Sequence, residues 1–460
     1  MNDLDNEEVA RDYGAAIVIH VEFAGEERRR AAEARLEEAT GLAEAIDLRV
    51  AQAEIVTLQN PRPATLIGSG RVNLIASMLD GFEQRPGLVI VDAPLTPGQH
   101  RNLEKAWNAK VLDRTALILE IFGARARTAE GRLQVDLAHL TYQKSRLVRS
   151  WTHLERQRGG RGFLGGPGER QIESDRRAIQ EKIDRLREKL EQVRRTRTLQ
   201  REKRRKAPHP VVALVGYTNA GKSTLFNRLS NSEVVARDQL FATLDPTMRA
   251  LDLPSGQRVI LSDTVGFISD LPTQLVAAFR ATLEEVEEAD LILHVRDSSH
   301  EDAEAQRDDV IDVLSQLGID ADDERPVIEV MNKVDLLTEE DKRALISATR
   351  LSRVDAAKTI VEPMRVAISA VTGEGIDELL AAIDALMTRD RHRYGVSIAA
   401  GDGAALAWLH AHGDVRSESL DDNGIEIEVR LSDKARGQFS KLFPRAVVSE
   451  RSDDSARMIA

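Results

Sequence analysis

The sequence contains no cysteine among its 460 residues. This absence excludes disulfides, cysteine-ligated zinc, iron–sulfur clusters and thiol nucleophiles, and it fits a reducing cytosol. Aromatic residues make up only 4% of the chain, so aromatic stacking cannot be a pervasive theme. No apolar run approaches the roughly 18 residues that a membrane-spanning helix needs. The acidic N-terminus lacks the apolar segment of a signal peptide. We therefore expect a cytoplasmic, monomeric protein without a membrane span.

A net positive charge is also lacking, because the chain carries −12 at pH 7. Taken as a whole, this charge argues against a nucleic-acid partner. The charge is unevenly distributed, however. Residues 140–206 contain 21 Lys/Arg and 9 Asp/Glu, a local balance of +12 that leaves −24 for the rest of the chain. Such a run is usually a solvated helical face. A surface for nucleic acid is the alternative interpretation.

Apolar runs alternate with helical patterns near the N-terminus. Strands are expected at 15–22, 50–58, 88–91 and 111–112, with helices over 26–45, after Gly70 and from about Pro97. This alternation predicts an α/β domain over residues 1–128 with a mainly parallel sheet. The chain is long enough for about three domains at roughly 150 residues each.

Two long helices should follow, over 132–157 and 170–206, because apolar residues recur there at helical spacing. Six glycines in residues 159–169 interrupt them, so residues 129–206 are predicted to form a basic antiparallel helical hairpin. The alternation of strands and helices resumes over 207–390. The last region, 391–460, is predicted to be a small α+β domain with a helix at 404–412 and a strand at 425–431.

A phosphate-binding loop is the most specific motif. It fits G-x-x-x-x-G-K-[ST] between a strand and a helix, and it comprises Gly216, Tyr217, Thr218, Asn219, Ala220, Gly221, Lys222, Ser223 and Thr224. Backbone N–H groups at a helix N-terminus would hold the phosphates. Lys222 would reach the β- and γ-phosphates, and the Ser223 hydroxyl would bind Mg²⁺.

A second carboxylate for magnesium is expected at the end of a neighbouring strand. Asp263 meets this expectation, and Gly266 follows it in the pattern D-x-x-G, where its N–H would donate to the γ-phosphate. A threonine between the two motifs would sense the γ-phosphate through Mg²⁺. Thr243 is the first candidate and Thr247 the second. The catalytic set predicted is thus Lys222, Thr243 and Gly266.

Base recognition is predicted from the run N-K-x-D after an apolar strand, which contains Asn332, Lys333 and Asp335. The Asp335 carboxylate would accept hydrogen bonds from guanine N1–H and N2–H₂, which adenine does not offer. A backbone N–H in the pair Ser369 and Ala370 would contact guanine O6. Together with the phosphate motifs, these elements predict a P-loop GTPase domain of the translation-factor type.

Two positions bear on hydrolysis. Many GTPases carry a glutamine after D-x-x-G to orient the attacking water, and this chain has Phe267 there. Either Phe267 is simply packed and intrinsic hydrolysis is poor, or something else, such as a partner, organises the water. Asn219 lies where potassium-dependent GTPases of this broad class bind K⁺ beside the phosphates, so K⁺ is a candidate cofactor.

Three stretches resemble the HflX-type GTPases, a subfamily of bacterial ribosome-associated GTPases. They are DTVGFISDLPTQLVAAFRATLEEV (263–286), GPGERQIESDRR (166–177) and LIGSGRV (66–72). The resemblance covers roughly residues 15–390 and leaves the role of the tail open. It implies a GTPase that binds the large ribosomal subunit and its rRNA and dissociates stalled ribosomes, notably under heat stress. The arginines expected at RNA are then Arg149, Arg156, Arg158, Arg161, Arg170, Arg176 and Arg177.

Two other functions compete with ribosome splitting. One is a ribosome-bound GTP switch in subunit assembly or translation that does not split ribosomes. The other is an RNA-modification GTPase, which the absence of cysteine disfavours. A second nucleotide site in the leading domain is a further alternative. Gly68 and Gly70 form G-x-G there, but Asn73 replaces the third glycine of a dinucleotide motif.

Overall fold

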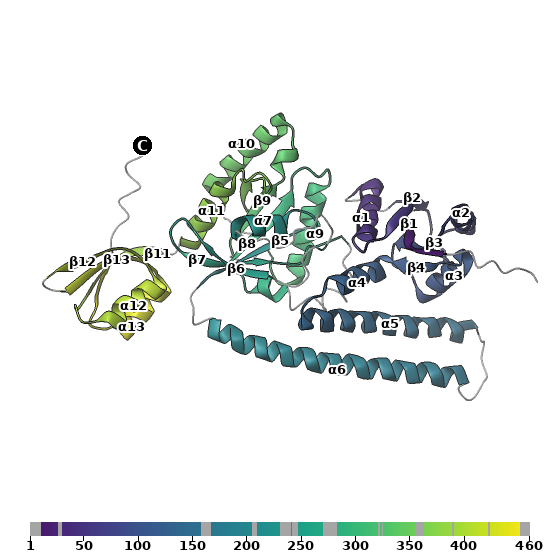
Figure 1. Ribbon diagram of the computed structural model, residues 1–460, viewed down its shortest axis with the longest axis horizontal. Coiled ribbons are helices and arrows are strands. Elements are labelled where there is room, and N and C mark those ends of the chain that lie inside the picture. Colours follow the sequence, from purple (N-terminus) through teal and green to yellow (C-terminus); the bar gives the residue numbers. More distant parts are fainter. Residues whose placement is uncertain are drawn as a thin grey trace, which may run out of the picture.

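The computed structural model describes residues 11–25, 30–157, 167–204, 209–230, 241, 247–269, 283–320, 323, 325–355, 363–388, 391–421 and 424–450. Within these ranges the chain forms three sheets and a long helical hairpin (Figure 1). We call the part from β1 to α4 the N-terminal unit, the part from β5 to α11 the central unit, and the part from β11 to β14 the C-terminal unit. The fold is α/β, as predicted.

The N-terminal unit is built on a fully parallel sheet of order β2-β1-β3-β4. Its elements are β1 (Arg11–Phe23), α1 (Ala32–Glu44), β2 (Arg49–Leu58), α2 (Ser69–Asp80), β3 (Arg85–Asp92), α3 (Pro97–Trp107), β4 (Lys110–Asp113) and α4 (Arg114–Arg125). Every position of β3 is buried, which explains its nearly continuous apolar run. Sequence reasoning missed α4, which begins where the Asp113 side chain accepts a hydrogen bond from the N–H of Ala116 at 2.8 Å.

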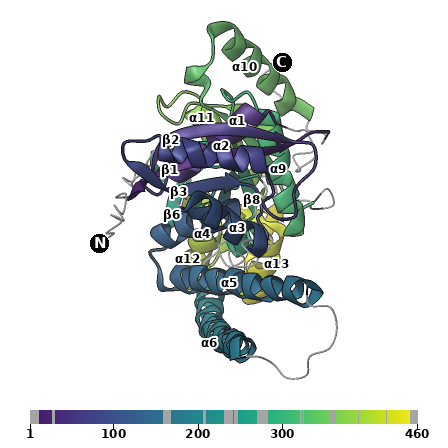
Figure 2. The ribbon, with the colours of Figure 1, turned by 90° about the vertical axis from the view of Figure 1, so that its right-hand side faces the viewer.

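The hairpin consists of α5 (Ala129–Gln157) and α6 (Pro167–Arg204). Figures 1 and 2 show the two helices side by side beneath the N-terminal and central units. The first turns of α5 pack on the N-terminal unit, because Val135 and Ala138 join the same buried cluster as Phe122 of α4. Most described side chains of α6 are exposed, and Ile183 is one of the few that are buried. The hairpin therefore presents wide polar faces.

The central unit has a six-stranded sheet of order β10-β9-β8-β5-β7-β6, in which only β6 runs antiparallel to its neighbour. Its strands are β5 (Val211–Gly216), β6 (Thr247–Asp252), β7 (Arg258–Asp263), β8 (Leu291–Asp297), β9 (Val327–Asn332) and β10 (Met364–Ala367). Its helices are α7 (Lys222–Ser230), α9 (Ala303–Gln316), the 3-10 turn η1 (Val334–Leu336), α10 (Glu339–Asp355) and α11 (Ile376–Thr388). The carboxyl ends of β5, β7, β8 and β9 meet at one edge, where ligands of such sheets bind.

The C-terminal unit is α+β, with an antiparallel sheet of order β12-β13-β11-β14. Its elements are β11 (Arg391–Ile398), α12 (Gly403–His412), β12 (Asp414–Asp421), β13 (Gly424–Ser432), α13 (Asp433–Leu442) and β14 (Val447–Glu450). The order of elements, β-α-β-β-α-β, and the strand order are those of ferredoxin-like folds. The two helices and the inner face of the sheet enclose a separate core that includes Tyr394 and Phe439.

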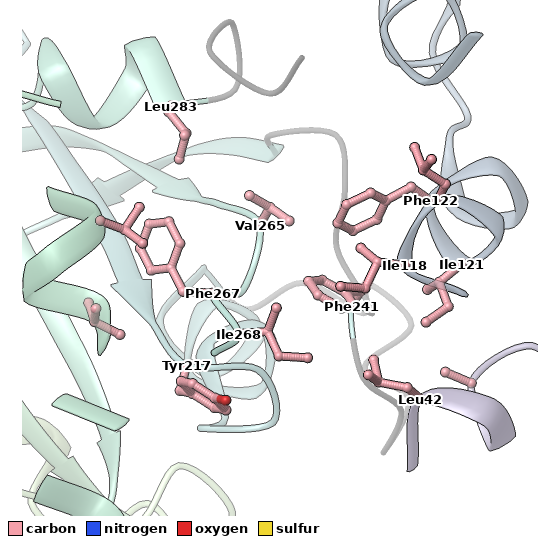
Figure 3. Packing of buried hydrophobic residues seen from close by; sticks show 14 of the residues in the cluster. Leu42, Ile118, Ile121, Phe122, Tyr217, Phe241, Val265, Phe267, Ile268 and Leu283 are labelled. Atoms are coloured by element: carbon pink, nitrogen blue, oxygen red, sulfur yellow. The ribbon is translucent and has the colours of Figure 1, made fainter. Parts of the chain in front are cut away.

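One hydrophobic cluster continues from the N-terminal unit into the central unit (Figure 3). Leu42, Ile118 and Phe122 come from α1 and α4, and they face Phe241 and Ile268 of the central unit. The rings of Phe122 and Phe241 meet edge to face with their centroids 4.7 Å apart. The N-terminal unit is thus packed against the loops that follow the predicted nucleotide motifs. In the described part of the chain, no helix is both long and apolar enough to cross a membrane.

Candidate nucleotide site

Two glycines of the phosphate-binding loop are required by close approach. The loop joins β5 to α7, and the backbone at Gly216 and Gly221 has φ of 151° and 93°. A Cβ on Gly216 would lie 2.2 Å from the carbonyl oxygen of Val295, and one on Gly221 would lie 2.2 Å from Asn332 Nδ2. A side chain at either position is therefore incompatible with this loop.

Lys222 is buried at the start of α7, with 6% of its surface exposed. Its ammonium group donates hydrogen bonds to the carbonyl oxygens of Gly216, at 3.1 Å, and Tyr217, at 2.7 Å. Burial lowers the pKa of Lys222 to about 8, although the charge of Asp263 opposes this shift. Gly266 lies against it, because a Cβ there would be 2.9 Å from Lys222 Nζ. The structure thus brings Lys222 and Gly266 together, as predicted for groups that share the γ-phosphate.

Two of the three residues predicted to hold magnesium, Ser223 and Asp263, also meet. The Ser223 hydroxyl donates a hydrogen bond of 2.9 Å to Asp263 Oδ2, at the end of β7. A hydroxyl and a carboxylate suit the hard Mg²⁺ ion, so the donor set fits. Thr243 lies outside the described residues. Thr247, the second candidate, is the first residue of β6 and lies opposite Asp263 in the antiparallel ladder.

The base-reading elements converge on Asn332 at the end of β9. Its side-chain amide donates to the carbonyl oxygen of Ala220 at 2.8 Å and accepts from the N–H of Ala370 at 2.9 Å. Asn332 therefore connects the phosphate-binding loop to the predicted O6-reading loop. A backbone N–H of Ser369 or Ala370 is predicted to contact guanine O6, and in this structure the N–H of Ala370 donates to Asn332.

The remaining base-site residues lie beside this connection. Lys333 has a left-handed backbone with φ of 63°, and its ammonium pairs with Asp297 at 2.7 Å. Asp335 is exposed in η1, so its carboxylate is open to solvent. Ser369 is fully buried, and its hydroxyl accepts a hydrogen bond from the N–H of Thr372 at 3.0 Å. The predicted base site is therefore assembled at one edge of the sheet.

Phe267 is a packing residue in this structure. Only 1% of its surface is exposed, and its ring points into the core (Figure 3). Its backbone pairs with the phosphate-binding loop through two hydrogen bonds. The N–H of Thr218 donates to the carbonyl oxygen of Phe267 at 2.8 Å, and the N–H of Phe267 donates to the carbonyl oxygen of Gly216 at 3.1 Å. The D-x-x-G loop and the phosphate-binding loop are thus joined directly. Asn219 is exposed, with φ of 59°, and Thr224 is half-buried on α7.

A buried polar network, which sequence reasoning missed, joins the site to the N-terminal unit. Glu38 of α1 accepts hydrogen bonds from Arg30 at 2.7 Å, from the Ser269 hydroxyl at 3.0 Å, and from Arg114 and the Tyr217 hydroxyl. Burial alone would raise the pKa of Glu38, but the charges of Arg114 and Arg30 lower it below its ordinary value. Glu38 is therefore an anion shared by both units.

The network touches both nucleotide loops. Arg30 also donates to the Tyr217 hydroxyl at 2.8 Å, and the N–H of Ser269 donates to the same hydroxyl at 2.8 Å. Arg114 donates to the Ser269 carbonyl at 3.0 Å and to Asp92 at 2.6 Å. The only feature of the sequence that could have indicated this network is Tyr217, a tyrosine within the phosphate-binding loop. Its partners lie far away in the chain, so no local pattern reveals them.

The predicted RNA contacts fall on the hairpin. Arg176 and Arg177 are exposed on α6. Arg149 and Arg156 lie on α5 and Arg170 on α6, but their side chains are outside the described part of the structure. Arg158 and Arg161 are outside the described residues altogether. Two of the seven candidates can therefore be placed as solvent-facing.

Family models match most of the chain. They are the N-terminal region of GTP-binding GTPases at residues 33–123, their middle region at 125–204, a 50S ribosome-binding GTPase model at 211–333 and an HflX C-terminal domain at 355–454. The chain is 51% identical to the GTPase HflX of Magnetococcus marinus over 411 residues, covering 89% of this chain and 91% of the relative.

The chain belongs to the HflX family of GTPases. The GTPase HflX of Escherichia coli is 39% identical over 417 residues, covering 90% of this chain and 93% of the relative. A GTP-binding protein from Sulfolobus solfataricus, solved with GDP, is 22% identical with a TM-score of 0.44, covering 81% of this chain and 99% of that chain. The family match also extends the resemblance beyond residue 390, where sequence reasoning found little to use, to residue 454.

Proposed function

We propose that this HflX-family GTPase binds the large ribosomal subunit and its rRNA in the cytoplasm and dissociates stalled or idle ribosomes, under stress in particular. The observation that carries the proposal is the combination, in one chain of charge −12, of a GTPase site with a long hairpin in which residues 140–206 carry a balance of +12. The hairpin lies beneath the N-terminal and central units (Figures 1 and 2), and most described side chains of α6 are exposed. The description of the family model as a 50S ribosome-binding GTPase supports the same partner.

Within the site, each of these side-chain and backbone groups has a distinct role. Lys222 compensates the charge of the β- and γ-phosphates, and the N–H of Gly266 donates to the γ-phosphate. Ser223 and Asp263 would hold Mg²⁺, which would supply charge compensation for GTP hydrolysis. Asp335 accepts from guanine N1–H and N2–H₂ and so excludes adenine. Because Phe267 is packed in the core, the hydrolytic water is oriented by another group, which a ribosomal partner could supply.

Phosphate contacts supply most of the affinity of basic surfaces for RNA, and they depend on salt. Neutralising Arg176 and Arg177 together should therefore weaken co-sedimentation with large subunits and flatten its salt dependence, while GDP affinity stays unchanged. The matched control neutralises Arg258, which is also exposed but belongs to the central unit. Sedimentation is measured with GTP, GDP and a non-hydrolysable analogue. Unchanged ribosome binding by the double variant would exclude these two arginines as contacts.

A ribosome-bound switch without splitting is the alternative. The same pocket and hairpin would serve it, so light scattering of intact ribosomes with the protein and GTP separates the two functions. Falling scattering supports dissociation. Constant scattering, together with nucleotide-dependent co-sedimentation, supports the switch.

A further inference from the structure

The loop after β10 is predicted to read guanine O6, and its backbone is held from two sides. On one side, Asn332 accepts from the N–H of Ala370 at 2.9 Å. On the other, Arg228 of α7 donates from Nε to the carbonyl oxygen of Ala370 at 3.0 Å and from Nη2 to the carbonyl oxygen of Val371. One arginine therefore bridges two successive carbonyl groups of this loop. A planar guanidinium has the fork geometry that such a bridge requires.

Within the part of the chain that the structure describes, few other contacts hold the outer side of this turn. Val371 is 68% exposed. The bonds within the turn, such as the N–H of Gly373 to the carbonyl of Ser369 at 2.9 Å, close the turn on itself. An ion pair of 2.7 Å between Lys342 and Glu374 is an outer contact, and it lies further along the turn. Arg228 is thus the contact that connects the base-reading loop to α7.

Gly373 completes the fit around the guanidinium. Its backbone is left-handed, with φ of 93°, and a Cβ there would lie 3.2 Å from Arg228 Nη1. The loop thus passes close to the arginine at a residue that has no side chain. Helix α7, which carries Arg228, begins with Lys222 and Ser223, the residues predicted to bind phosphate and Mg²⁺. Helix α7 therefore contacts both ends of the proposed nucleotide site.

We propose that Arg228 is a positioning residue for guanine recognition: it holds the backbone of Ala370 and Val371 where a peptide N–H can contact guanine O6. This inference rests on the proposed reading of guanine by Asp335 and the loop after β10. Arg228 contacts Ala370 near the end of α7, whereas the predicted phosphate residues Lys222 and Ser223 are at its start, so we expect Arg228 to act on nucleotide binding rather than on the chemical step. Arg228→Gln should raise KM and leave kcat nearly unchanged.

The decisive experiment compares GDP with 6-thio-GDP, in which a weaker acceptor replaces O6 and the N1–H and N2–H₂ groups remain. For Arg228→Gln we expect GDP affinity to fall about tenfold, the size of one hydrogen bond to a charged group. The loss for 6-thio-GDP should be about threefold or less, because the contact that Arg228 supports is already weakened. Arg228→Lys can reach only one carbonyl and should recover part of the affinity.

Controls separate this inference from simpler explanations. Arg258→Gln removes another exposed arginine, which pairs with Asp252 at 2.7 Å, and it should change neither affinity. Equal losses for GDP and 6-thio-GDP, or no loss for either, would overturn the role of Arg228. If Arg228→Gln fails to fold, Arg228→Lys decides by the same comparison. Wild-type protein that binds ADP as tightly as GDP would instead defeat the proposed reading of guanine.

Discussion

Glu38 offers the sharpest test of how the N-terminal unit is joined to the GTPase site. The substitution Glu38→Gln keeps the shape of the side chain and removes its charge. Arg30 and Arg114 then lose a shared buried partner, although Arg30 retains Asp302 at 3.2 Å and Arg114 retains Asp92 at 2.6 Å. Breaking a buried ion pair costs about 3–5 kcal/mol. Because both arginines keep another partner, we expect Glu38→Gln to lower the free energy of unfolding by about 3 kcal/mol, at the lower end of this range. In a folding unit of 150–250 residues, this corresponds to a fall of about 6–12 °C in melting temperature.

Tryptophan fluorescence can follow the N-terminal unit alone. The chain has three tryptophans, and Trp107 is fully buried in that unit. With Trp151→Phe and Trp408→Phe, unfolding is read at Trp107. GDP at 100 times its Kd should stabilise the central unit by about 2.7 kcal/mol. Because the two units share a core and Glu38, the Trp107 transition should rise by about 5–11 °C with GDP in this background. Glu38→Gln should reduce that rise by more than half.

The matched control is Glu329→Gln. Glu329 is also buried and accepts from Arg307 at 2.6 Å and from Arg365 at 2.9 Å, all within the central unit. Its substitution should destabilise the central unit but leave the GDP-dependent rise of the Trp107 transition in place. If GDP does not change the unfolding temperature read at Trp107 in the parent protein, the coupling between the two units is refuted. So would a Glu38→Gln variant whose Trp107 transition responds to GDP in full.

Three further predictions concern the site itself. Lys222→Ala should abolish GTP hydrolysis in a phosphate-release assay, and detectable turnover would contradict the phosphate role. The pKa of Lys222 is about 8 in the free protein, and bound phosphates raise it, so the nucleotide binds the charged form. GDP affinity should therefore be full below pH 8 and fall about tenfold per unit as the pH rises beyond it. Titration calorimetry checks this, and a flat profile to pH 10 would be incompatible with it. Hydrolysis should be faster in K⁺ than in Na⁺ if Asn219 binds K⁺, and equal rates would reject that role.

Local patterns predicted much of the fold and the phosphate site. The alternation of strands with helices gave the parallel N-terminal sheet, and the spacing between Gly216 and Lys222 gave the loop between β5 and α7. These two predictions succeed because a few consecutive residues determine the local backbone geometry of a strand, a helix or the loop between them. Helix α4 was missed because its apolar run does not by itself distinguish a buried helix from a strand.

Long-range partners could not be predicted in the same way. Glu38 and Tyr217 are 179 residues apart, and nothing near either residue indicates the other. The same holds for Arg228 and Val371, which are 143 residues apart. Such contacts depend on how whole units pack, and only the assembled structure places them. The positions of Thr243, Arg158 and Arg161 remain predictions, since they lie outside the described residues.

The most direct test of the account exchanges the base that the site reads. Asp335→Asn replaces an acceptor with an amide, which can donate to the 2-oxo group of xanthine, so the variant should prefer XTP to GTP. Intact ribosomes are then followed by light scattering with this variant and either nucleotide. We predict that XTP, and not GTP, lowers the scattering. Loss of scattering with GTP, or no loss with XTP although XTP is bound, would contradict the claim that the nucleotide in this pocket drives ribosome dissociation.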